Sequence, residues 1–82
     1  MLSKARMDKI RDFYADGNVV WNSHWNQYDL VVGFNLGRHG WFVMVRECDA
    51  AGNILPGSIG GARAHSTIPT KRDRIISRKE DR

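Results

Sequence analysis

The sequence predicts a small two-layer α+β domain, in which a three-stranded antiparallel sheet carries an N-terminal and a C-terminal helix on one face (αβββα order). The first observation is a pair of apolar runs, residues 30–36 and 41–47, that flank Gly37–Gly40 and are typical of a β-hairpin. The second is the helical signals in residues 3–15 and 71–79, on either side of the expected strands. Since an isolated hairpin is only marginally stable, these helices are expected to cover it.

The length of the chain sets the scale of this fold. Its 82 residues, 41% of them hydrophobic, allow one sheet layer and one helical layer. We therefore expect a single domain over residues 1–82, with residues 80–82 as a disordered basic tail.

The first element is expected to be a helix from Ser3 to Ala15. Ser3 is a suitable N-cap, and Gly17 is suited to the left-handed position that follows a helix. The apolar residues recur at helical spacing and form one stripe: Met7, Ile10, Phe13 and Tyr14.

Residues 18–28 are expected to form a structured connection across one edge of the sheet. Val19–Trp21 can form a short strand, whereas the asparagines and the serine that follow favour turns. Trp25 and Tyr28 require partial burial, so the aromatic residues here either cover the core or form a recognition surface.

The hairpin at residues 29–48 has a predicted register set by a loop at Gly37–Gly40. One face of the hairpin is wholly apolar and should be buried. The other face has both polar and apolar residues and should be partly exposed to water. The apolar face pairs Leu36 with Trp41, Phe34 with Val43, and Val32 with Val45; the mixed face pairs Asn35 with Phe42, Gly33 with Met44, and Val31 with Arg46.

The last third of the chain predicts a strand and a helix. Residues 62–68 alternate, with Ala62, Ala64, Ser66 and Ile68 inward and Arg63, His65 and Thr67 exposed. Thr70 three residues before Asp73 resembles a capping box and predicts a helix from Lys71 to about Lys79, anchored by Ile75 and Ile76.

The predicted order of elements resembles, in topology, that of double-stranded RNA-binding domains. Lys71 and Arg72 lie where that family has phosphate-contacting lysines, which implies a nucleic-acid contact at the start of the last helix. The small residues of the family's helix are replaced by Ile75 and Ile76, and its glycine-serine lead-in is absent, so no family is assigned. The second half also resembles the three-stranded sheet and helix of plant-type and integrase arm-type DNA-binding domains.

Composition narrows the function classes. A formal charge of +4 and a pI near 9.7 favour an anionic partner. With one cysteine, no signal-peptide pattern and no apolar run long enough to span a membrane, we expect a cytoplasmic protein.

We expect no enzymatic activity, cofactor or metal. The metal-ligating residue types His24, His39, His65 and Cys48 lack the close spacing of a zinc motif. Residues 57–61 lack the lysine of a phosphate-binding loop. RNA cleavage with His65 or His24 as general acid or base is the enzymatic alternative and ranks third.

The first functional hypothesis is a small non-enzymatic nucleic-acid-binding module. DNA or RNA phosphates would bind to the basic last helix and third strand, together with the hairpin tip. The residues are Arg38, Arg63, Lys71, Arg72, Arg74 and Arg78.

The alternative is a protein-binding inhibitor or accessory factor, of the kind found in phages and mobile elements. Its partner would be a host protein complex or a second copy of the chain in a homodimer. The residues are the aromatic and apolar set Trp21, Trp25, Tyr28, Phe42 and Met44.

Overall fold

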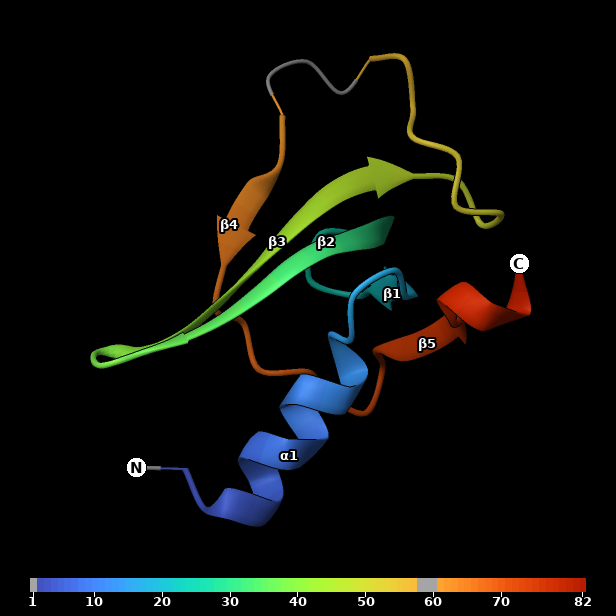
Figure 1. The fold of residues 1–82 in the computed structure, drawn as a ribbon. Coiled ribbons are helices and arrows are strands. Elements are labelled where there is room, and N and C mark those ends of the chain that lie inside the picture. The colour runs from blue at the N-terminus through green and yellow to red at the C-terminus, as the bar shows by residue number, and fades with distance from the viewer. Residues whose placement is uncertain (1, 58–60) are drawn as a thin grey trace.

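The computed structural model describes residues 2–57 and 61–82, which form one five-stranded antiparallel sheet and one α-helix (Figure 1). The strand order is β4-β3-β2-β1-β5. The elements are α1 (Lys4–Phe13), β1 (Val19–Asn22), β2 (Gln27–Gly37), β3 (Gly40–Cys48), β4 (Arg63–His65), β5 (Arg74–Ser77) and a 3-10 turn η1 (Lys79–Asp81).

The prediction of a three-stranded sheet with two helices was therefore wrong. β1 is an interior strand between β2 and β5, although residues 18–28 were expected to be a connection at an edge. The segment expected to form the C-terminal helix supplies β5 instead. Without that helix, the topological resemblance to RNA-binding domains is lost.

The helix α1 agrees with the sequence pattern. The Ser3 hydroxyl accepts a hydrogen bond from the Arg6 N–H at 3.2 Å, which confirms the predicted N-cap. Gly17 has a φ of +85° after the helix end, as expected of a glycine there. The helix contributes to a core made of Ile10, Tyr14, Val20, Val31, Val43 and Val45.

The capping-box pattern at residues 70–73 closes a turn and starts no helix. The Asp73 carboxylate accepts the Thr70 N–H at 2.8 Å, and the Asp73 N–H donates to the Thr70 carbonyl at 3.1 Å. Ile75 then pairs with Val20 of β1. Because β-branched residues fit a pleated surface and this helix would have had only two apolar anchors, pairing with β1 prevails.

The β2–β3 hairpin confirms its predicted loop, since Gly37 pairs with Gly40 around a two-residue turn. A bulge between Val31 and Gly33 shifts the register beyond it. As a result Val31 faces Val45 and is buried, whereas Val32, expected in the core, is 40% exposed.

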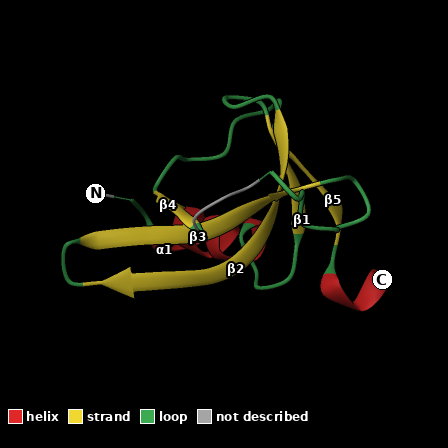
Figure 2. Cartoon of the chain, turned by 90° about the horizontal axis from the view of Figure 1, so that it is seen from above, coloured by secondary structure: helices red, strands yellow, loops and turns green. Residues whose placement is uncertain are grey.

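The sheet has two unlike faces. α1 lies on one of them, the helix face, and Figure 2 shows the helix beneath the sheet when it is viewed from above. Cross-strand pairing places on the other, the outer face, the side chains of Trp21, Tyr28, Leu30, Asn35, Phe42, Met44, Arg46, Ala64 and Arg74. A Cβ atom built on Gly33 of this face would meet no atom within 4 Å, so the outer face is open there.

One end of the outer face is covered. Val19 and Cys48 are buried there, and a Cβ on Gly52 would lie 3.2 Å from a Val19 methyl group. The Asp49–Asn53 turn carries Gly52, and Cys48 pairs with Ile54 beyond it.

The chain end lies against the first helix and the turn after it. The Arg78 guanidinium donates to the Asp12 carboxylate at 3.0 Å, and Arg82 donates to the Gly17 carbonyl and the Ser77 hydroxyl. Residues 80–82, expected to be a disordered tail, take part in this arrangement through η1 and Arg82. The glycine-rich loop expected at residues 57–61 lies partly outside the described residues.

Candidate nucleic-acid interface

Two of the six basic residues predicted to bind phosphate are already engaged by carboxylates. Arg63 donates to the buried Asp29 at 3.2 Å, and Arg78 pairs with Asp12 at 3.0 Å. Arg63 also lies on the helix face with His65, so the prediction that these two side chains point to solvent from an outer strand face was wrong. Arg63 and Arg78 therefore leave the candidate interface.

Four of the predicted cations remain without an ion pair to any described carboxylate, and three of them are close together in the chain. Lys71 and Arg72 lie in the turn that precedes β5, and Arg74 is the first residue of that strand. All three are exposed. Arg38 is exposed as well, but it lies at the tip of the β2–β3 hairpin, far from β5 (Figure 1).

Lys71 and Arg72 border a shallow groove of about 530 Å³. Its opposite wall comes from the turn that joins β1 to β2. The lining residues are Ser23, His24, Thr70, Lys71 and Arg72. The groove therefore combines two permanent cations, one imidazole and two hydroxyl groups, which is a suitable set for a phosphate oxygen.

The carboxylate nearest the groove, Asp73, serves to join its two walls. It accepts hydrogen bonds from the Ser23 N–H at 2.7 Å and the Ser23 hydroxyl at 2.6 Å, besides the Thr70 N–H. Burial acts to raise the pKa of Asp73, but the bonds from Ser23 and Thr70 outweigh it and lower that pKa. Because its oxygens are occupied by these donors, Asp73 does not form an ion pair with Lys71 or Arg72.

Sequence reasoning missed the β1–β2 side of the groove. Ser23 is 47 residues from Thr70, which it contacts across the groove, and His24 is the next residue along. The local signal for their position is the asparagine before them: Asn22 Oδ1 accepts the N–H groups of His24 and Trp25 at 3.0 and 3.2 Å. This Asx-type contact is typical of a tight turn.

The turn beside the groove also holds Trp25 in a fixed position. The Arg63 guanidinium lies 4.4 Å from the centre of the Trp25 ring, within the range of a cation–π contact. Arg63 is fixed in turn by Asp29, whose other donors are Asn22 at 3.2 Å and Gln27 at 2.6 Å. Trp25 is 46% exposed in this arrangement.

Four of the five residues of the alternative, protein-binding set share one face of the sheet, at different positions along the strands. Trp21, Tyr28, Phe42 and Met44 all lie on the outer face, and the rings of Trp21 and Tyr28 are in edge contact at 5.0 Å. Trp25 is separate from them, because it belongs to the β1–β2 turn and contacts Arg63 of the helix face.

Two observations concern the metal-ligating residue types and the free cysteine. Among the described residues, no three histidine, cysteine, aspartate or glutamate side chains are close enough to hold a metal ion. Burial, and then the negative charge of Asp29, raises the pKa of the Cys48 thiol to about 11, which leaves it protonated and unreactive near neutral pH. In the described part of the chain, no helix is long and apolar enough to cross a membrane.

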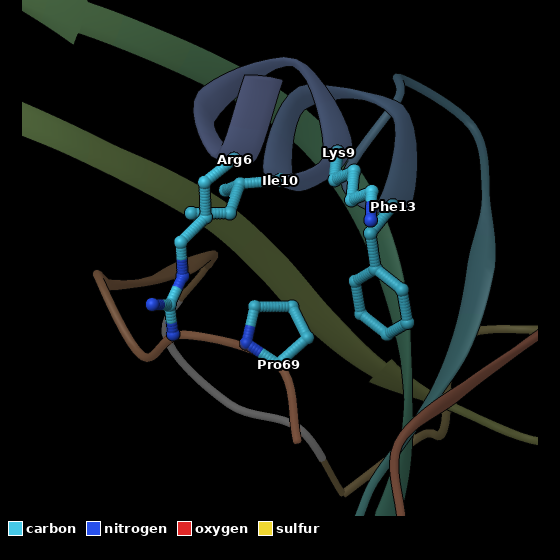
Figure 3. Close-up of a pocket in the computed structure, with 5 residues that line it drawn as sticks. All are labelled: Arg6, Lys9, Ile10, Phe13 and Pro69. Carbon is cyan, nitrogen blue, oxygen red and sulfur yellow. The ribbon is translucent and has the colours of Figure 1, made fainter. Parts of the chain in front are cut away.

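A second, smaller pocket of about 150 Å³ lies beneath α1. Figure 3 shows Pro69, from the segment between β4 and β5, opposite Ile10 and between the side chains of Arg6 and Phe13. Ligand pockets usually hold about 300–1,000 Å³, so this space is small for a cofactor or substrate.

Comparisons of the chain with models of protein families, with curated proteins and with solved structures give no match.

Proposed function

We propose that this protein is a nucleic-acid-binding module that contacts phosphates through the groove at Lys71 and Arg72 and through the neighbouring Arg74. The observation that carries the proposal is the set of three exposed cations without ion partners among the described residues. They lie next to a carboxylate that is occupied by donors from both walls of the groove.

The physical basis is electrostatic. Each phosphate neutralised by Lys or Arg releases condensed counterions, so binding should weaken steeply as salt is added. The proposed contacts are to the backbone, which supplies affinity and orientation and carries no direct sequence information. The hydroxyls of Ser23 and Thr70 and the ring of His24 add hydrogen-bonding groups along the same groove.

The test is a titration of labelled oligonucleotides by fluorescence anisotropy at several salt concentrations. The double variant Lys71→Gln/Arg72→Gln should weaken binding and reduce the slope of log K against log salt by about 1.4 to 1.8, since each contact contributes about 0.7 to 0.9. The matched control is Lys9→Gln/Arg11→Gln, which removes two exposed positive charges from α1. Equal losses in both variants would assign binding to net charge and reject the groove.

A second candidate function is protein binding through the outer face, either to another protein or to a second copy of this chain. Four side chains predicted for this role lie on that face, and Phe42 among them is 42% exposed. Sheet faces with exposed aromatic residues are suited to an apolar interface core.

The test for this candidate uses Phe42→Ala. The variant should abolish self-association in sedimentation equilibrium, or binding to a captured partner, and leave the melting temperature nearly unchanged. A melting temperature that falls by more than about 10 °C would assign Phe42 to the core of the fold.

A further inference from the structure

Trp25 is the most exposed of the large apolar side chains around the groove, and it is firmly positioned. Its 46% exposure means that the core does not require it. The contacts that hold this exposed ring in place make it available to a ligand in one defined position.

The side chain is fixed by a chain of contacts that begins in the interior. Asp29 has no exposed surface and accepts hydrogen bonds from Asn22, Gln27 and Arg63. Arg63, whose side chain is 35% exposed, spans from this carboxylate to the Trp25 ring. Burial of a charged group is energetically unfavourable unless the charge is paired. Here the pairing of the buried Asp29 carboxylate with Arg63 also orients the exposed Trp25 ring.

The backbone of the turn is fixed as well. Asn22 accepts the N–H groups of both His24 and Trp25, and Asn26 adopts a φ of +53°, in the left-handed region that few non-glycine residues occupy. The Trp25 ring is therefore preorganised, and a ligand that contacts it loses little side-chain entropy.

The ring is adjacent to the cationic groove. His24, which lines the groove, has its ring centre 5.1 Å from that of Trp25 at an interplanar angle of 85°. A flat aromatic surface thus lies beside two free cations and a pair of hydroxyl groups. Aromatic rings beside a positively charged groove are the combination that binds single-stranded nucleic acid, because every base has a π-face to stack.

We propose that Trp25 is a stacking platform for a base of single-stranded DNA or RNA whose phosphates occupy the groove at Lys71 and Arg72. This inference rests on the proposed function and adds its substrate class. In a duplex the bases are stacked on one another and their faces are unavailable to a side chain, whereas unpaired bases can stack on the ring. Preference for single strands over duplexes follows from this arrangement.

The experiment compares a labelled single strand with the duplex of the same sequence, for the wild type, Trp25→Ala and Trp25→Phe. Trp25→Ala should weaken single-strand binding about five- to hundredfold, as loss of one stacked base does. It should leave the salt slope unchanged and have little effect on the duplex. Trp25→Phe should retain most of the affinity, since phenylalanine also stacks.

Intrinsic fluorescence gives an independent measurement. Binding of an unlabelled single strand should quench wild-type tryptophan emission, and Trp25→Phe should lose most of that quenching while it still binds. This variant keeps an aromatic ring beside Arg63, so it tests the platform even if Trp25→Ala does not fold.

Three outcomes would overturn the inference, and they differ from failure of the proposed function. Equal loss of single-strand and duplex binding in Trp25→Ala, no loss at all, or full quenching in Trp25→Phe would each reject stacking on Trp25. In these cases the phosphate groove would still be supported if Lys71→Gln/Arg72→Gln weakened binding more than the control Lys9→Gln/Arg11→Gln. If the wild type binds neither nucleic acid at low salt, the proposed function itself is rejected.

Discussion

Replacement of Asp29 by asparagine should destabilise the protein strongly, because the charge that organises the buried polar network is removed. In the folded protein both carboxylate oxygens accept hydrogen bonds, Oδ1 from Gln27 and Oδ2 from Asn22 and Arg63. An asparagine retains one acceptor and places an NH₂ group among donors. Arg63 then loses its ion pair while it is still mostly buried.

The size of the effect follows from this geometry. Loss of one partner of a buried ion pair costs about 3–5 kcal/mol. Arg63 is 35% exposed and can turn partly toward water, so we expect about 2–3 kcal/mol. For a domain of this size, each kcal/mol lowers the melting temperature by roughly 4–8 °C. Asp29→Asn should therefore melt roughly 10–20 °C below the wild type.

The assay is urea denaturation followed by circular dichroism, with thermal melting as a second measure. Asp8→Asn is the matched control, because Asp8 pairs with Lys4 at 3.0 Å on the surface, where both side chains are more than half exposed. Such surface pairs contribute at most about 1 kcal/mol. If Asp29→Asn is within about 1 kcal/mol of the wild type, the carboxylate does not organise the network, and the explanation for the position of Trp25 fails with it.

Three further predictions concern the core and its titrating groups. Val43→Ala should lower the free energy of unfolding, measured by urea denaturation, by about 2–3 kcal/mol, because Val43 is buried. Val32→Ala at the exposed bulge should lower it by less than about 0.5 kcal/mol. Similar losses in the two variants would contradict the bulged register. Burial and then the charge of Arg63 lower the pKa of His65 below 6.5, so stability should fall as pH drops below 6.5, and His65→Gln should remove that part of the dependence. The Cys48 thiol, with its pKa near 11, should react with a disulfide reagent at pH 8 far more slowly in the native than in the urea-unfolded protein.

Local signals predicted the elements whose contacts are close in sequence. The N-cap at Ser3, the helix after it and the turn at Arg38–His39 all depend on residues within a few positions of one another. The β5 strand depends on Val20, more than fifty residues away from Ile75, and no local pattern around Ile75 and Ile76 indicates that partner. Hence the local pattern of the two isoleucines predicts a helix.

The strand faces were harder to predict than the strands. One bulge at Val32 exchanges Val31 and Val32 between core and surface, and nothing in the run of β-branched residues fixes where it occurs. On β4, Arg63 and His65 were placed in solvent because charged residues usually are. Their inward position depends on Asp29 and Tyr14, which lie in other elements.

The basic character of the candidate interface could be predicted from the sequence. The residues that make it up could be predicted only in part. The basic excess of the last third is visible in the sequence, and it includes Lys71, Arg72 and Arg74. Which cations are neutralised depends on carboxylates distant in sequence: Asp29 for Arg63 and Asp12 for Arg78. Trp25 was grouped with the other aromatic residues, since the sequence does not indicate that its partner is an arginine from β4.

The contacts of the acidic side chains decide which cations of the last third of the chain lack an ion partner. Asp12 and Asp29 are paired with arginines, and Asp73 is occupied by Ser23 and Thr70. Lys71, Arg72 and Arg74 therefore keep positive charges without an ion pair among the described residues. A cluster of unpaired positive charges raises the local concentration of anions and steers their approach. The carboxylate of Asp29 fixes Arg63 and through it orients Trp25, so a change at Asp29 should weaken both stability and single-strand binding.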